Sequence, residues 1–212
     1  MIDLYTWTTP NGRKVSILLE ELCIPYTVHS IDISKNEQFA SDFLKIAPNN
    51  RIPAIIDQET GIHLMETGAI MMYLASKHRK FQCRGDEYWR MVEWMMWQVG
   101  GLGPMLGQLH HFVKYNKGTS AYAETRYQTE AKRLYSVLNE RLAGRDFIAG
   151  EGNGVYSIAD IACWPWVSRF EWQEIDLRDF SNIRDWYVRI AGRPAVQRGY
   201  SVPKFTTEVP MP

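Results

Sequence analysis

Residues 5–14, "YTWTTPNGRK", run from a strand-like start through a Pro-Asn-Gly turn into an amphipathic helix. The apolar residues after the turn share one helical face: Val15, Leu18, Leu19 and Leu22. In a redox protein with this order of strand, turn and helix, we expect a reactive cysteine at the turn, and this turn has none. Two alternatives stay open: the turn is not a redox site, or the reacting sulfur belongs to a ligand.

Strand and helix patterns alternate through the first 80 residues. Strands are expected at 2–7, 26–33, 51–57 and 63–65, and helices after the first turn, at about 37–44 and at 66–77. Pro53 cannot donate to a strand ladder, so it should be the first residue of its strand or lie at an edge. The order β-α-β-α-β-β-α predicts an α/β domain over residues 1–80.

From about Gly85 the strand patterns stop and apolar residues repeat at helical spacing. The repeats are Trp89, Val92, Met96 and Val99, then Tyr127, Ala131, Leu134, Leu138 and Leu142, then Ile183, Trp186 and Ile190. The change of pattern near residues 79–86 indicates a domain boundary. We therefore expect an all-helical domain over residues 87–204.

The composition excludes several classes of partner. Lysine plus arginine equals aspartate plus glutamate, 24 of each, which removes the electrostatic case for a nucleic-acid or membrane-surface partner. No uncharged apolar run reaches the ~18 residues that a membrane span needs, and no signal-peptide pattern is seen. The three cysteines are far apart and form no CxxC motif, which favours a reducing cytosol.

No metal site is expected. His110 and His111 are adjacent rather than four residues apart, and no cysteine or acidic cluster accompanies them. Cys163 lies in an apolar helix and is expected to be an inert core thiol. Cys83 lies in a polar linker and could be oxidised, without an evident partner.

The stretch "NNRIPAI", residues 49–55, admits two interpretations. It is either a buried strand that begins with proline, or a strand preceded by a cis Ile52-Pro53 peptide, which occurs in only ~5–6% of X-Pro bonds. A cis peptide would turn the backbone N–H and C=O of Ile52 outward. A bound peptide could then pair with Ile52 as an extra strand.

Two helix starts carry small polar residues. Glu66 and Thr67 begin one helix, and Thr9 and Asn11 begin another. Ordinary N-terminal capping explains both. The functional interpretation is that the Thr67 hydroxyl and first-turn N–H groups hold a carboxylate while Glu66 meets an ammonium group, as an α-amino acid end would require. The opening turn would favour an anion through the helix dipole.

These features together resemble a cytosolic glutathione transferase over nearly the whole chain. The motif "SIADIACWPW" adds to the resemblance, because Ser157 and Asp160 have capping-box spacing ahead of an apolar helix. The resemblance implies a thioredoxin-like α/β N-terminal domain followed by an all-α C-terminal domain.

Four stretches narrow the resemblance to the bacterial nu-class proteins and the related fungal Ure2p-like group. They are "TTPNGRKVSILLEEL", "APNNRIPAIID", "WQVGGLGPMLGQLHHF" and "YSIADIACWPWV". The most particular is the Gly-Gly-Leu-Gly-Pro insertion at residues 100–104. Glycine and proline both disfavour helix interiors, so we expect this insertion to break or bend its helix.

The resemblance implies a glutathione site, and its first residues concern the sulfur and the peptide backbone. Thr9 and Asn11 would lie against the glutathione sulfur as the catalytic pair. Gln38 would reach one end of the tripeptide. Ile52, before Pro53, would pair with the cysteinyl backbone.

The remaining implied residues concern the charged ends of glutathione. Glu66 and Thr67 would hold the γ-glutamyl end. Arg126 matches an arginine that in this group can contact a glutathione carboxylate, either within a subunit or across a dimer, although a solvated helix residue is the alternative. Arg51 could also meet a carboxylate, or simply face solvent.

The resemblance further implies a glutathione-dependent disulfide-bond oxidoreductase. Bound glutathione, not a protein cysteine, would supply the thiolate that attacks a small disulfide, in a cytoplasmic homodimer that uses glutathione in its reduced or oxidised form and no metal. One alternative is a transferase that conjugates glutathione to apolar electrophiles. Another is a non-catalytic Ure2p-like interaction protein, against which the lack of an Asn/Gln-rich extension counts.

Overall fold

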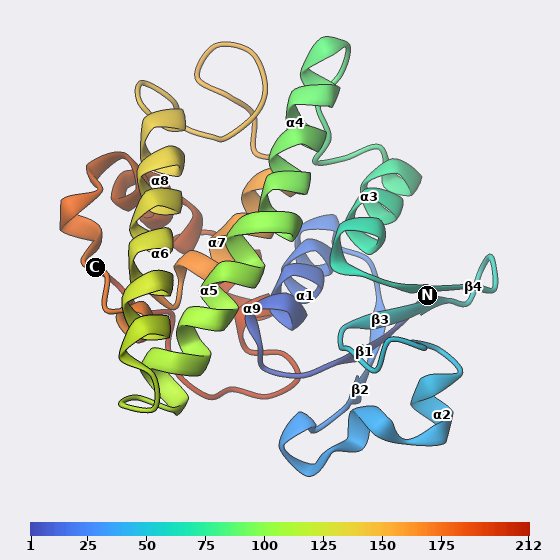
Figure 1. Cartoon of the computed structure of the whole chain (residues 1–212). Helices are drawn as coiled ribbons and strands as arrows, with labels where there is room; N and C mark the ends of the chain where they lie inside the picture. Colours follow the sequence, from blue (N-terminus) through green and yellow to red (C-terminus); the bar gives the residue numbers. More distant parts are fainter. The chain divides into compact units, whose positions relative to one another are not determined.

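The computed structural model describes all 212 residues, which divide into two compact units (Figure 1). The first unit is Met1–Lys80 with Ala191–Val209, and the second is Phe81–Ile190 with Pro210–Pro212. The predicted domains, 1–80 and 87–204, differ from these units mainly at residues 191–204. That segment contains α9 (Pro194–Tyr200), which packs on α1 (Pro10–Leu22) within the first unit.

A single glycine explains how α9 approaches α1. A Cβ atom added to Gly199 would lie 2.6 Å from the Cα atom of Ile17, so only glycine fits there. The Ser16 hydroxyl donates a 2.7 Å hydrogen bond to the Gly199 carbonyl across the same contact. This contact joins residues 183 positions apart, and no local pattern in the sequence predicts it.

The first unit contains a four-stranded sheet with the order β2-β1-β3-β4. Its strands are β1 (Ile2–Thr6), β2 (Tyr26–Ser30), β3 (Ala54–Asp57) and β4 (Ile62–Met65). Strand β1 is parallel to β2 and antiparallel to β3, and β4 is antiparallel to β3. The predicted order of elements and the thioredoxin-like α/β class are confirmed.

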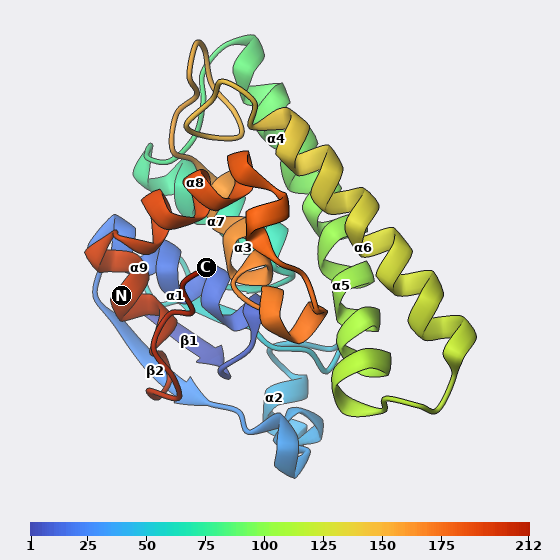
Figure 2. The same cartoon turned by 90° about the vertical axis from the view of Figure 1, so that its left-hand side faces the viewer.

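Helices cover both faces of this sheet. Helices α1 and α3 (Thr67–His78) lie on one face, and α2 (Ser41–Leu44) lies on the other with the short 3-10 turns η1 (Ile33–Lys35) and η2 (Glu37–Phe39) (Figure 1, Figure 2). The core under α1 and α3 consists of fully buried apolar side chains: Leu4, Leu18, Leu19, Ile55, Ile70 and Leu74. On the other face, Phe43 of α2 packs with Ala54, Tyr5 and Met65.

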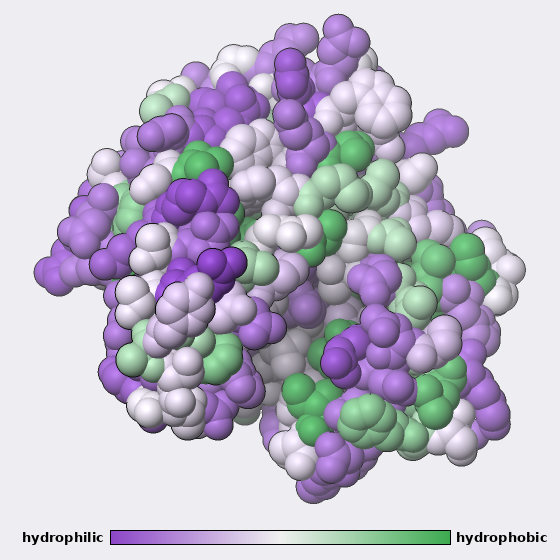
Figure 3. All heavy atoms as spheres, viewed as in Figure 1, coloured by the Kyte–Doolittle hydropathy of each residue, from purple (hydrophilic) through white to green (hydrophobic).

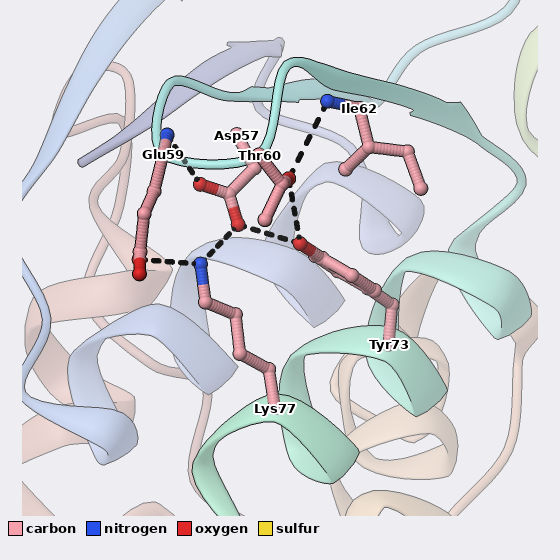
Figure 4. A network of polar contacts seen from close by, with 6 residues as sticks. All are labelled: Asp57, Glu59, Thr60, Ile62, Tyr73 and Lys77. Carbon is pink, nitrogen blue, oxygen red and sulfur yellow. Dashed lines mark hydrogen bonds and ion pairs between the residues drawn. The ribbon is translucent and has the colours of Figure 1, made fainter.

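A polar network anchors α3 to the end of β3 (Figure 4). The buried Asp57 carboxylate accepts hydrogen bonds from Tyr73 Oη at 2.6 Å and Lys77 Nζ at 2.5 Å, and Lys77 also pairs with Glu59 at 2.7 Å. Burial raises the pKa of Asp57, but these donors outweigh it and lower the pKa to about 2. The carboxylate therefore stays ionised and fixes α3 on the sheet.

The second unit is all-helical, as predicted. Its elements are α4 (Asp86–Trp97), the π-helical turns η3 (Gln98–Leu102) and η4 (His110–Tyr115) on either side of α5 (Gly103–Leu109), α6 (Ala121–Arg141), α7 (Ile158–Val167), the 3-10 turns η5 (Phe170–Gln173) and η6 (Leu177–Asp179), and α8 (Ser181–Ala191). The run from α4 to η4 lies beside α6 (Figure 1, Figure 2). No helix of the chain is long and apolar enough to span a membrane.

The glycine-rich insertion does not end its helix. The Gly103 N–H bonds to the Gln98 carbonyl, so the chain makes one π-helical turn and continues into α5. Pro104 lies in the first turn of α5, where a missing N–H is tolerated. A π-helical turn accommodates an extra residue, so of the two expected outcomes, a break or a bend, the break does not occur.

The predicted capping box of α7 is present. Ser157 caps the helix, and the Asp160 carboxylate accepts from the Ser157 backbone N–H at 3.0 Å. The fully buried Asp160 also accepts from the Ile148 N–H and the Trp186 indole, both at 2.9 Å. The box therefore also organises the core of the second unit.

Candidate functional site

The strand register brings four predicted segments to one edge of the sheet. Tyr5 pairs with Ala54, and Ala54 pairs with Met65, so three segments meet there: the turn after β1, residues 52–53 before β3, and residues 66–67 after β4. Ser30 pairs with Thr6, so the segment after β2, which carries Gln38, leaves the sheet at the same edge. The sheet thus gathers residues from four separate parts of the sequence.

The turn after β1 presents a hydroxyl at the start of α1. Thr9 is the N-cap residue, and its Oγ1 accepts a 3.1 Å hydrogen bond from the Gly12 N–H. A hydroxyl oxygen that accepts in this way can direct its own hydrogen toward a ligand. Asn11, half-buried, lies in the same first turn, where the helix dipole favours negative charge.

Gly12 shapes this turn, a role that the sequence analysis did not assign. A Cβ atom at residue 12 would lie 2.2 Å from the Trp7 carbonyl oxygen, so a larger residue would push α1 away from the end of β1. The Tyr5 hydroxyl does not take the place of the Thr9 hydroxyl at this turn. The Tyr5 ring stacks on His29, with the centroids 4.5 Å apart, and packs near Phe43.

The Ile52-Pro53 peptide is cis. Pro53 is buried immediately before the first residue of β3, and Ile52 is half-buried. The Ile52 N–H and C=O make no hydrogen bond with the rest of the chain. This backbone pair, at the end of the central strand β3, is therefore available to an extended peptide.

Gln38 is buried in η2, with only 9% of its surface exposed. Its Oε1 atom has no hydrogen-bond partner in the chain. A buried amide oxygen without a donor is unfavourable, so a ligand N–H at this position would remove the penalty.

The start of α3 has an unusual backbone. Glu66 is its N-cap residue, but it lies at φ 67°, ψ 116° and makes no capping hydrogen bond with its side chain. The Glu66 carboxylate is exposed and accepts only a long 3.4 Å contact from Asn49. Non-glycine residues in such a conformation are strained and concentrate at functional sites.

Thr67, the first residue of α3, is buried and contacts a lysine that the sequence analysis missed. Lys14 Nζ of α1 donates to Thr67 Oγ1 at 3.2 Å, and Lys14 itself is only 2% exposed. A signal was present in the sequence, because Lys14 lies four residues before Leu18 and therefore on the apolar face of its helix.

Arg126 and Arg51 are both exposed. Arg126 lies on α6 in the second unit and lines a hollow of about 560 Å³ with Tyr122, Tyr127 and other residues. Arg51 donates to the carbonyl of its neighbour Asn50 at 3.3 Å. Neither side chain is held by a carboxylate of the chain.

None of the three cysteines lies in these segments. None of them forms a disulfide: Cys23 is exposed, and Cys83 and Cys163 are buried. Burial, with the charges of Glu87 and Asp160, raises the pKa of Cys83 to about 11, so this thiol is not a nucleophile at neutral pH.

The structure contains no cluster of side chains that could bind a metal ion, and His110 is not part of one. His110 is buried, and burial together with Arg169 lowers its pKa to about 4. Its Nε2 lies 3.1 Å from Gln173 Nε2, which fits a neutral imidazole that accepts from the amide. No group of three or more His, Cys, Asp and Glu residues could hold a metal ion.

Two protein-family models match the chain. The model described as the glutathione S-transferase N-terminal domain covers residues 1–76, and the C-terminal domain model covers residues 104–194. Among curated proteins, the disulfide-bond oxidoreductase YfcG of Escherichia coli (strain K12) is 47% identical over 201 residues, which is 92% of each chain.

Solved structures agree with this relationship. A glutathione transferase of Burkholderia graminis, with two glutathione molecules bound per subunit, is 40% identical with a TM-score of 0.89, over 97% of this chain and 89% of that one. One from Pseudomonas putida, with one glutathione disulfide bound per subunit, is 36% identical with a TM-score of 0.88, over 95% and 91%. With matches across both units, the chain belongs to the glutathione S-transferase family.

Proposed function

We propose that this protein is a glutathione-dependent disulfide-bond oxidoreductase in which bound glutathione supplies the reactive thiolate. The observation that carries the proposal is the turn after β1, where Thr9 presents a hydroxyl at a helix N-terminus that contains no cysteine. The 47% identity to a protein named as a disulfide-bond oxidoreductase supports the same reaction. Residues 1–80 would be the glutathione-binding domain.

The residues of the first unit divide the tripeptide among them. Thr9 and Asn11 face the sulfur. Ile52, held by the Pro53 turn, pairs with the cysteinyl backbone. Gln38 supplies its unpaired amide oxygen to a ligand N–H.

The γ-glutamyl end is assigned to the start of α3. Thr67 and the first-turn N–H groups bind the carboxylate, and the exposed Glu66 carboxylate meets the ammonium group. The exposed Arg126 guanidinium would bind a glutathione carboxylate from the second unit or from a partner chain.

The reaction is a thiol–disulfide exchange in two steps. A glutathione thiol has a pKa of about 8.5, and donors at a helix N-terminus lower that value and favour the thiolate. The thiolate attacks one sulfur of a substrate disulfide, forms a mixed disulfide and releases the other sulfur as a thiolate. A second glutathione thiolate attacks the mixed disulfide, giving glutathione disulfide and the second substrate thiol.

The setting of this activity is also proposed. We infer a nu-class, cytoplasmic enzyme, because three cysteines without a disulfide suit a reducing compartment. We infer a homodimer, because large apolar side chains are exposed on helices of the second unit, including Trp89 and Met96 on α4 and Tyr122 on α6. On the face in Figure 3, apolar residues lie in several patches separated by hydrophilic ones.

A cysteine-free variant tests the proposal. The triple variant C23A/C83A/C163A, shown to be folded by its thermal unfolding curve, should reduce a small disulfide with glutathione at close to the rate of the unchanged protein. Loss of this activity in a folded variant would contradict the proposal. A high rate with an aryl halide and poor disulfide reduction would instead identify a conjugating transferase, and no glutathione binding in calorimetry would favour a non-catalytic protein.

A further inference from the structure

Lys14 is a buried ammonium group beside the proposed γ-glutamyl site. It projects from α1, is only 2% exposed, and donates from Nζ to the Thr67 hydroxyl of α3 at 3.2 Å. Lysine is almost never fully buried unless it serves a partner. The contact joins residues 53 positions apart and links the second turn of α1 to the first residue of α3.

The contact determines how the Thr67 hydroxyl is used. An ammonium group can only donate hydrogen bonds, so Thr67 Oγ1 must be the acceptor in this pair. The hydroxyl hydrogen is then directed away from Lys14. A polarised hydroxyl of this kind is a stronger donor to a carboxylate than one without a charged partner.

The start of α3 adds to this effect. The first turn of α3 contains no acidic residue, and Glu66 makes no capping bond with its side chain. The first-turn N–H groups and the helix dipole therefore favour negative charge at the same place as the Lys14 ammonium group. Donors from two helices converge on one small region.

We propose that Lys14 is a positioning residue for the α-carboxylate of the γ-glutamyl group, acting through Thr67 and through its own positive charge. The inference rests on the proposed function, since that function makes Thr67 a glutathione ligand. Lys14 does not touch the sulfur or the reacting atoms. It selects ligands that carry a carboxylate at their γ-glutamyl end.

If Lys14 had only a structural role, its loss would change ligand binding in a different way. If Lys14 only joined α1 to α3, its loss would loosen the whole site and weaken every glutathione-like ligand equally. If it positions the carboxylate, its loss affects only ligands that have that carboxylate. A ligand pair separates the two roles: glutathione and γ-aminobutyryl-cysteinylglycine, which lacks only the glutamyl α-carboxylate.

The experiment compares Lys14→Met with the unchanged protein by calorimetry on both ligands. Lys77→Met is the matched control, because it removes a lysine that holds Asp57 at the other end of α3. We expect Lys14→Met to weaken glutathione binding about tenfold or more and to leave binding of the analogue unchanged. Turnover should show a raised KM for glutathione with little change in kcat, and Lys77→Met should change neither affinity.

Three outcomes are decisive. Equal weakening of both ligands by Lys14→Met, or no weakening of either, would overturn the role of Lys14 while leaving the proposed function intact. Failure of the unchanged protein to bind glutathione would overturn the proposed function itself. If Lys14→Met does not fold, Thr67→Val applies the same ligand pair, and equal losses on both ligands would again overturn the proposal.

Discussion

The two helix starts at the edge of the sheet are built differently, although each offers a threonine hydroxyl. At α1, Thr9 accepts from the backbone N–H of Gly12, three residues along the same helix. At α3, Thr67 accepts from the ammonium group of Lys14, which lies on another helix. The start of α1 thus uses an uncharged donor from its own helix, and the start of α3 uses a buried charged donor from another helix.

This difference matches the two groups that each start would bind. A thiolate is stabilised by hydroxyl and N–H donors, yet must stay reactive, and a full positive charge in contact would lower its nucleophilicity as its pKa falls. A carboxylate only has to be held, so a buried cation strengthens binding without a penalty in rate. The difference therefore supports the proposed division, in which α1 would carry catalysis and α3 affinity.

Thr9→Ala should have the largest effect, because it removes the hydroxyl at the catalytic start. We expect kcat for disulfide reduction to fall about a hundredfold, the effect of losing one aligned donor to a developing anion. Glutathione affinity should fall far less, and Thr9→Ser should retain most of the activity. Steady-state kinetics with calorimetry tests this, and equal losses in kcat and affinity would argue against thiolate stabilisation.

Lowering the pH should loosen α3 before α1, because Asp57 anchors α3 and not α1. The folded-state pKa of Asp57, about 2, lies below the unfolded value of 3.8, so its contribution is fully present above pH 4 and is lost as the pH falls toward 2. The shift corresponds to about 2 kcal/mol of stability at neutral pH. Hydrogen exchange should show α3 amides losing protection first.

The variant Asp57→Asn provides the control for this pH effect. It should be less stable at neutral pH and should show a weaker loss of stability between pH 4 and 2. An unchanged pH profile in this variant would mean that other carboxylates cause the acid loss. Lys77→Met should also lower stability at neutral pH, because it removes the ion pair between Lys77 and Asp57.

Glu66→Gly should separate stability from binding at the α3 start. Glu66 lies at φ 67°, a positive φ that glycine tolerates better than glutamate, so folding stability should stay the same or rise by about 0.5–1 kcal/mol. Glutathione affinity should fall about tenfold, because the carboxylate that meets the ammonium group is lost.

The matched control for Glu66→Gly lies at the other end of the same helix. Arg79, the C-cap residue of α3, lies in the left-handed region at φ 52°, ψ 36°, so Arg79→Gly also relieves a positive φ without touching the proposed site. Thermal unfolding and calorimetry on both variants test the assignment. If Glu66→Gly bound glutathione as tightly as Arg79→Gly, Glu66 would not be a ligand residue.

The sequence predicted the parts of this site that depend on local chemistry. The strand–turn–helix at Thr9, the proline before β3 and the Glu-Thr helix start are each visible in short stretches. The register Tyr5–Ala54–Met65, which aligns these stretches, was not predicted and is seen only in the structure.

The missed features depend on contacts between distant residues. The place of Lys14 on the apolar face of α1 can be read from the sequence, but its contact with α3 cannot, and the unpaired Gln38 oxygen is evident only once the segment after β2 is folded. The packing of α9 on α1 depends on Gly199, which has no local signal. The Gly-Gly stretch at 100–101 was expected to break or bend a helix, and a backbone bond that reaches five positions back keeps the chain helical there.

Arg126→Ala should have the smallest effect and extends the comparison beyond the first unit. Arg126 is exposed on α6, where a single ion pair with a ligand carboxylate contributes little, so we expect KM for glutathione to rise only about threefold with kcat unchanged. Added salt should reduce the difference, because salt screens exposed charges. Arg133→Ala is the matched control, since Arg133 on the same helix pairs with Glu130 instead of a ligand.

If Arg126 acts across a dimer, dilution below the dimer dissociation constant should raise the KM of the unchanged protein to that of the variant. A KM that is independent of protein concentration in both would place the arginine's action within one chain, and an unchanged KM in Arg126→Ala would leave carboxylate recognition to α3 and Lys14.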